Sequence, residues 1–223
     1  MKLILSGGGN GQQSKGVDSL FASLLVNKNI LYIPVAMDRN KHPHDECLAW
    51  MKNGFAPYGD FQITLLDEKG MENISYEEMT KYGGIFIGGG NTFKLLKIFK
   101  ETGFEEKLKK LIIETDNPVL GGSAGALIFA KSIETAGPYD PNNFEITDFS
   151  GMNLINGMNI WVHYNNGMDD LVMEYTKRLG TKIIAIPEDS GLYIDNGKIF
   201  VVGENSVKIF PTMEIIMKGE SKF

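Results

Sequence analysis

Cysteine is almost absent from this chain of 223 residues, since Cys47 is the only one. A single cysteine cannot form an internal disulfide, so a reducing compartment is the simplest expectation. No apolar run approaches the roughly 18 residues of a membrane helix, and the run that begins at Leu3 is too short for a signal peptide. These absences predict a cytoplasmic protein with no membrane partner.

Positive charge is also scarce. Arg39 and Arg178 are the only arginines, and 22 basic residues against 28 acidic ones give a net charge of −6. Nucleic-acid binding needs a concentrated basic face, which the sequence lacks, so we expect no nucleic-acid partner. Hydrophobic residues at 43% and charged residues at 22% are ordinary for a globular protein, and the length suits one domain over 1–223.

Metal ligands are few, because the chain has only three histidines. His42 and His44 flank a proline and have no further histidine or cysteine ligand close by other than the apolar-face residue Cys47. This pattern favours a solvated loop over a metal centre. We expect neither a metal nor a cofactor.

The glycine-rich turn after the first apolar run does not complete a nucleotide-binding motif. Gln12 stands where a G-x-G-x-x-G pattern beginning at Gly7 needs its third glycine. The spacing of a P-loop ends at Gly16, but Val17 follows where lysine is required. We interpret this turn as structural.

Short apolar runs alternate with amphipathic helical patterns over the first 130 residues. Strands are expected at 3–5, 30–35, 61–66, 85–87 and 119–122, with helical patterns between them. Such continuous apolar strands are typical of a parallel sheet covered by helices on both faces. The sequence therefore predicts an α/β fold of the flavodoxin-like three-layer type, with functional residues at the carboxyl ends of the strands.

The remainder of the chain has a different character. Residues 132–158 are rich in Gly, Pro, Asn and Asp and are expected to form a long ordered loop. Strands are then predicted at 159–162 and 182–186, on either side of a helix over 168–179. Three short apolar runs separated by turns, at 191–194, 198–202 and 207–210, predict a C-terminal antiparallel meander.

A candidate nucleophile lies where the fifth predicted strand ends. Gly121, Ser123 and Gly125 fit the pattern G-x-S-x-G, in which a serine occupies a tight turn between a strand and a helix. Small flanking residues are needed there because the turn takes unusual backbone angles and passes close to its neighbours. The first free N–H groups of the following helix can stabilise negative charge.

A nucleophilic serine needs a base, and the base needs an acid to orient it. His163 directly follows a predicted strand, and so do Glu188 and Asp189. Along this chain the candidates occur in the order serine, histidine, glutamate. In the α/β-hydrolases the acid, Asp or Glu, comes between the serine and the histidine. An acid from the long loop would instead give the hydrolase order. Three carboxylates of this loop are therefore open alternatives to Glu188: Asp140, Glu145 and Asp148.

The chain resembles the peptidase E family, the α-aspartyl dipeptidases related to cyanophycinase. The resemblance is carried, in order, by Ile87-Gly88-Gly89-Gly90-Asn91-Thr92-Phe93, Gly122-Ser123-Ala124-Gly125-Ala126, Asp140-Pro141-Asn142-Asn143-Phe144, Trp161-Val162-His163-Tyr164 and Ile186-Pro187-Glu188. It covers nearly the whole chain.

This resemblance implies a catalytic triad of Ser123, His163 and Glu188. It also implies an oxyanion hole made by the backbone amides of Gly90 and Ala124. The neighbouring residues Gly89, Asn91 and Gly122 are expected to contact substrate.

Two features depart from the usual pattern of the family. Gly122 stands where members typically carry tryptophan. The segment between His163 and Glu188 is short and lacks the arginine-bearing insertion expected of aspartyl dipeptidases. Arg178 is the nearest arginine and is predicted to lie on the outer face of a helix. A roomier pocket is therefore expected, and a preference for N-terminal aspartate stays open.

We expect a serine hydrolase that cleaves short peptides in the manner of a dipeptidase, through an acyl-enzyme. The expected partner is a small peptide substrate, and the sequence does not predict an oligomeric state. Two alternatives stay open: another hydrolase or amidotransferase on the same sheet, and a member of the superfamily that binds a ligand without catalysis.

Overall fold

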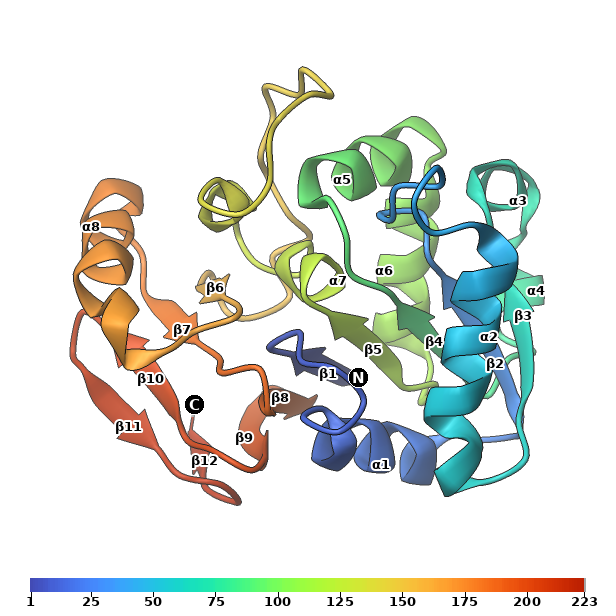
Figure 1. The fold of residues 1–223 in the computed structure, drawn as a ribbon, viewed down its shortest axis with the longest axis horizontal. Helices are drawn as coiled ribbons and strands as arrows, with labels where there is room; N and C mark the ends of the chain where they lie inside the picture. The colour runs from blue at the N-terminus through green and yellow to red at the C-terminus, as the bar shows by residue number, and fades with distance from the viewer. Residues whose placement is uncertain (223) are drawn as a thin grey trace.

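The computed structural model describes residues 1–222 and contains a large twisted sheet with helices on both faces and a smaller sheet beside it (Figure 1). The large sheet has the strand order β12-β9-β8-β1-β5-β4-β2-β3. Its five N-terminal strands are parallel, and the other three join by antiparallel pairing: β1 (Lys2–Ser6), β2 (Asn29–Ile33), β3 (Gln62–Leu65), β4 (Gly84–Ile87), β5 (Val119–Gly122), β8 (Ser190–Asp195), β9 (Lys198–Gly203) and β12 (Ser221–Lys222).

The two faces of this sheet are buried by different helices. Along β1, Leu3 and Leu5 join the core under α5 (Thr92–Glu101) and α6 (Phe104–Glu114), whereas Ile4 joins the core under α1 (Lys15–Leu24) and α2 (His44–Phe55). Alternate residues thus pack on opposite faces, and both sets are apolar, as the sequence predicts for a covered parallel sheet. The helices of this part are α1 (Lys15–Leu24), α2 (His44–Phe55), η1 (Ala56–Tyr58), α3 (Glu68–Asn73), α4 (Tyr76–Met79), α5 (Thr92–Glu101), α6 (Phe104–Glu114) and α7 (Ala124–Leu127).

The smaller sheet has the order β11-β10-β7-β6 and carries helix α8. Its core surrounds the fully buried Trp161. Its elements are β6 (Asn159–Trp161), η3 (Asn166–Met168), α8 (Asp169–Leu179), β7 (Ile183–Ala185), β10 (Val207–Phe210) and β11 (Glu214–Ile216).

The C-terminal strands differ in one respect from the predicted meander. β8 and β9 form the expected hairpin on the edge of β1. β10 instead leaves the large sheet and pairs antiparallel with β7. Phe210 of β10 thereby joins the core around Trp161, together with buried side chains of β7 and α8.

The long loop over 132–158 is ordered, as predicted. It contains only a short helix, η2 (Glu134–Ala136), and one bridge between Ser132 and Ser150. Ile133, Met152 and Ile155 anchor it in the main core, where each is at most 2% exposed. The loop is thereby held over the carboxyl ends of the parallel strands. No helix among residues 1–222 is long and apolar enough to cross a membrane.

Candidate active site

Ser123 occupies the turn between β5 and α7 with φ 52° and ψ −112°, a conformation that non-glycine residues rarely adopt. A Cβ on Gly121 would lie 2.1 Å from the Gly125 carbonyl oxygen, and one on Gly125 would lie 2.3 Å from that of Ile87. The G-x-S-x-G glycines are therefore required by the close packing of the turn. This packing holds the serine in a strained position at the end of the sheet.

His163 lies beside this serine. Its Nε2 is 2.8 Å from Ser123 Oγ. The histidine follows β6 and also has a positive φ, of 52°. Its backbone amide donates to the carbonyl of Gly7 at 2.9 Å, which ties the smaller sheet to the end of β1. The pair therefore depends on contact between two sheets that are distant in sequence.

Glu188 lies on the other side of the imidazole, with Oε1 3.0 Å from Nδ1 of His163. Its second oxygen accepts a hydrogen bond from Gln13 Nε2 at 2.8 Å. The hydrogen bonds from His163 and then from Gln13 lower the pKa of the Glu188 carboxyl. An ionised carboxylate cannot donate, so Nδ1 of a neutral ring carries the proton and Nε2 is left to accept from the serine hydroxyl.

The rival acids of the long loop have other partners. Asp140 accepts from the amide and the hydroxyl of Thr92, at 2.8 and 2.6 Å. Asp148 pairs with Lys100 at 2.5 Å, and Glu145 is exposed. Among the candidate acids of the sequence, Glu188 is the one that forms a hydrogen bond with His163.

The amides of Gly90 and Ala124 flank the serine and have no acceptor within the described chain. Gly90 has φ +132°, and a Cβ there would lie 2.4 Å from the Ala36 carbonyl. A Cβ on Gly89 would lie 3.2 Å from Ser123 Cβ. The loop after β4 can therefore pass close to the serine only because these positions are glycine.

Sequence reasoning missed two contributors to this arrangement. A Cβ on Gly8, which has φ +99°, would lie 2.5 Å from His163 Cε1 and 2.9 Å from Ser123 Cβ. Gln13 holds Glu188 from the same glycine-rich turn. The available signal was the position of this turn at the carboxyl end of β1, where functional groups of such sheets gather.

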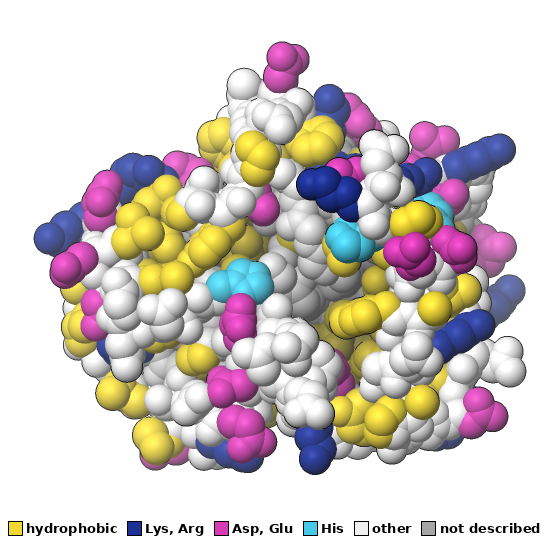
Figure 2. Space-filling view, in the orientation of Figure 1, with side chains coloured by type: hydrophobic (Ala, Val, Ile, Leu, Met, Phe, Trp, Pro, Cys, Tyr) yellow, Lys and Arg dark blue, Asp and Glu magenta, His cyan; other side chains and the backbone are white. Residues whose placement is uncertain are grey.

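A cavity of about 390 Å³ opens beside Ser123 and His163. Figure 2 shows a hollow near the centre of this face, bordered by a histidine side chain. Gly89 and Gly122 contribute to its lining. Asn91 caps α5 instead, since its Oδ1 accepts from the amide of Lys94 and its Nδ2 donates to the carbonyl of Pro141, both at 2.9 Å.

The charged residues of the cavity lining are all acidic or histidine. Asp18 and Asp140 line it, and no lysine or arginine of the described chain does. Arg178 lies on α8, 48% exposed, with Glu134 at 3.6 Å, as the predicted outer-face position implies. Within residues 1–222, no group of three or more His, Cys, Asp or Glu side chains is arranged to hold a metal ion. Cys47 is buried in the core, in agreement with its expected position on an apolar helix face.

Comparison with known proteins identifies the family. Residues 3–202 match Peptidase family S51. The chain belongs to this family. Its relatives include a Drosophila melanogaster protein named "Probable alpha-aspartyl dipeptidase", 26% identical over 92% of this chain and 85% of its own length. Peptidase E of Haemophilus influenzae is 27% identical over 82% of this chain and 92% of its own length.

Solved structures share the fold. A Listeria monocytogenes protein provisionally named peptidase E superposes with a TM-score of 0.69 at 20% identity, covering 92% of this chain and 98% of its own. A peptidase from an acI-B1 actinobacterium gives a TM-score of 0.64 at 18% identity, covering 99% and 96%. These structures show the shared fold, whereas the family match and the named relatives show a serine-type peptidase related to peptidase E.

Proposed function

We propose that this peptidase hydrolyses short peptides with Ser123, His163 and Glu188 as its catalytic triad. The observation that carries the proposal is the chain of contacts from the serine hydroxyl through both ring nitrogens to one carboxylate, at 2.8 and 3.0 Å. The strained turn at Ser123 adds support, because strain of this kind is typical of nucleophiles at the end of a sheet.

In the proposed mechanism, His163 accepts the hydroxyl proton while Ser123 Oγ bonds to the scissile carbonyl carbon. The amides of Gly90 and Ala124 donate to the resulting oxyanion. His163 then protonates the leaving amine as the carbon–nitrogen bond breaks, which leaves an acyl-enzyme. Water, deprotonated by His163, releases the acyl group and restores the serine.

Glu188 has two tasks in this scheme. Its hydrogen bond fixes the tautomer of His163, and its negative charge stabilises the imidazolium that forms during each step. The hydrogen bonds that lower its pKa keep the carboxyl ionised over the range in which histidine works as a base. Gln13 positions this carboxylate through the second oxygen.

Short substrates suit the size of the cavity. A volume of about 390 Å³ lies near the lower end of small-molecule sites, and the ordered loop contributes Tyr139 and Asp140 to one wall. A peptide of a few residues fits such a space. A side-chain carboxylate at the N-terminus would need a cation, which the lining lacks, so we propose a dipeptidase-like enzyme without a requirement for aspartate.

The test is Ser123→Ala, assayed against a dipeptide library that includes Asp-Leu. We expect loss of all cleavage with unchanged thermal stability, while Ser19→Ala, an exposed serine of α1, keeps full activity. Retained activity in Ser123→Ala would end the assignment. Ester and amide substrates run in parallel identify another hydrolase or amidotransferase, and no turnover of any substrate would identify a non-catalytic ligand-binding protein.

A further inference from the structure

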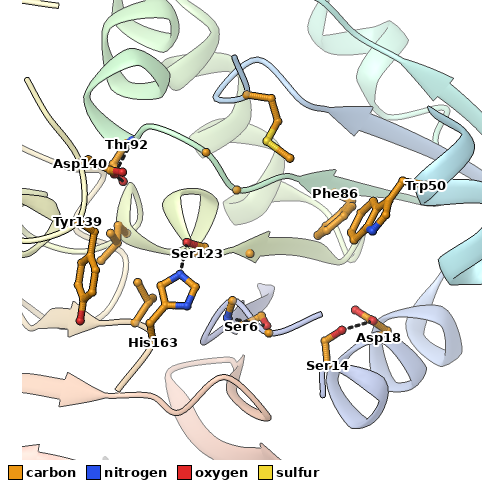
Figure 3. A pocket seen from close by; sticks show the side chains of 18 residues that line it. Ser6, Ser14, Asp18, Trp50, Phe86, Thr92, Ser123, Tyr139, Asp140 and His163 are labelled. Carbon is orange, nitrogen blue, oxygen red and sulfur yellow. Dashed lines mark hydrogen bonds between the residues drawn. The ribbon is translucent and has the colours of Figure 1, made fainter. Parts of the chain in front are cut away.

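The cavity extends from Ser123 in two directions (Figure 3). Thr92, Tyr139 and Asp140 lie to one side of the serine. Asp18 and Trp50 lie to the other side, together with Ser14 and Phe86. Asp140 is already engaged by two hydrogen bonds from Thr92, so the second side holds the carboxylate with fewer partners.

An aromatic wall bounds the second side. The ring of Phe86 stacks on that of Tyr32, with centroids 5.5 Å apart, and on that of Trp50, with centroids 6.4 Å apart. Tyr32 and Phe86 are buried, whereas Trp50 is 52% exposed. The stack therefore begins in the core and ends with an indole that a ligand can reach. An indole face attracts cations because its quadrupole is negative.

Asp18 faces the same space without a counter-ion. Its Oδ2 accepts a hydrogen bond from Ser14 Oγ at 2.6 Å, and no lysine, arginine or histidine of the described chain forms an ion pair with it. Lys15 and Tyr58 lie nearby, but Tyr58 donates its hydroxyl to the carbonyl of Lys15 instead. Burial raises the pKa of Asp18 to about 6, so at neutral pH the cavity wall carries an ionised, poorly solvated carboxylate.

Gly122 leaves this region open. A Cβ built there would point at the Phe86 ring, 3.7 Å from Cε2. Any larger side chain would extend between the nucleophile and the aromatic wall. Asp18 and Trp50 also line a neighbouring cavity of about 700 Å³, so the space does not close behind them. A long or branched substrate group can therefore pass from the serine to the carboxylate.

We propose that Asp18, Trp50 and Phe86 form a subsite for a cationic nitrogen of the substrate, either its free N-terminal ammonium or a lysine or arginine side chain. The carboxylate supplies the charge, the indole supplies a cation–π contact, and Gly122 keeps the path open. This inference rests on the proposed peptidase function of Ser123 and adds the class of substrate. Where the cation is a lysine or arginine side chain, the subsite favours basic side chains over aspartate; where it is the N-terminal ammonium, the subsite favours a free N-terminus.

The test uses four 4-nitroanilides: those of lysine, norleucine, Nα-acetyl-lysine and Nα-acetyl-norleucine. Norleucine has nearly the length of lysine without its charge, and acetylation removes the N-terminal charge. In the unmodified protein, removal of the cation that occupies the subsite should lower kcat/KM about ten- to hundredfold. A loss from lysine to norleucine identifies the side-chain ammonium as the cation in the subsite. A loss from a free substrate to its acetylated form identifies the N-terminal ammonium.

Asp18→Asn should bring the affected ratio towards one, because the amide keeps the shape of the site and removes its charge. Asp60→Asn, at an exposed aspartate, is the matched control and should keep the ratio of the unmodified protein. Trp50→Leu should reduce the ratio of kcat/KM between the charged and uncharged substrates in part. Gly122→Leu should slow cleavage of the cationic substrates more than cleavage of substrates with small side chains. Equal rates for all four substrates, or a ratio that survives Asp18→Asn, would overturn the proposal.

A binding measurement separates this inference from the catalytic proposal. Lysine amide, norleucine amide and Nα-acetyl-norleucine amide are titrated by calorimetry into Ser123→Ala and into the double variant with Asp18→Asn. Tighter binding of lysine amide than of norleucine amide, or of norleucine amide than of its acetylated form, supports the subsite if Asp18→Asn abolishes the difference. This holds even if no peptide is cleaved, an outcome that would count against the catalytic proposal alone. Equal binding of lysine amide by both proteins, together with equal binding of acetyl-norleucine amide and norleucine amide, overturns the subsite even if peptides are cleaved.

Discussion

Replacement of Asp18 by asparagine should make the ligand-free protein more stable at pH 8. The pKa of this carboxyl is raised from 3.8 to about 6 by burial. Such a shift corresponds to about 3 kcal/mol of folding free energy at most. Because the side chain is partly exposed and solvent screens its charge, we expect about 1–2 kcal/mol, or roughly 3–6 °C in Tm for a chain of this length.

The sign follows from the order in which the folded and unfolded states lose the proton. Between pH 4 and pH 6 the unfolded chain releases it first, so the stability of the unmodified protein falls as pH rises through this range. An asparagine side chain has no such titration. The advantage of Asp18→Asn should therefore be near zero at pH 4 and should reach its full size above pH 7.

Thermal unfolding followed by circular dichroism across pH 4–8 measures this difference, with Asp60→Asn correcting for the change in net charge. If the unmodified protein were as stable as Asp18→Asn at pH 8, or if the difference did not change with pH, then Asp18 would not be a buried carboxylate without a counter-ion. A gain in stability on removal of the charge is the signature of a group kept for binding rather than for folding.

Three further variants test individual contacts. Glu188→Gln should lower kcat by about a hundred- to ten-thousandfold with little change in KM, because the wrong tautomer of His163 would face the serine; an unchanged kcat would contradict this. Gly8→Ala should abolish turnover, since its Cβ would lie 2.5 Å from the His163 ring, and activity near that of the unmodified protein would refute the close packing seen here. Asn91→Ala should cost about 1 kcal/mol of stability through loss of the α5 cap, as read from chemical denaturation, and unaltered stability would disprove the cap.

The sequence predicts most of the fold because its local patterns agree with the final packing. The apolar runs at 3–5, 30–33 and 85–87 are strands buried on both faces, and the strands and intervening helices follow directly from their periodicity. Ser75 and Glu78 form a capping box at the start of α4, and its S-x-x-E pattern is visible in the sequence. Each of these features depends on residues that are close in sequence.

Features that depend on distant partners were harder to predict. The run at 207–210 is a strand as expected, but its pairing with β7 rather than β9 is set by the core around Trp161. The short elements α3 and β11 gave no clear periodic signal. A pattern of period two identifies a strand and its two faces, yet it does not specify which neighbour the strand pairs with.

The site shows the same division. Ser123 is marked by a local motif, whereas the roles expected for His163 and Glu188 came from family resemblance as much as from their positions after strands. Gln13 and Asp18 gave no signal of their own, because an isolated glutamine or aspartate near a helix start is ordinarily a surface residue. Only the three-dimensional arrangement brings the first to Glu188 and the second to the cavity.

The most direct test of the account is to look for an acyl group on Ser123 during turnover. A lysine ester should acylate the serine faster than water removes the acyl group, so acid quenching followed by intact-mass spectrometry should detect the acylated protein. We predict an added mass of one acyl group, mapped to the peptide that contains Ser123 and absent from Ser123→Ala and His163→Ala. Turnover without an adduct on that serine would contradict the account.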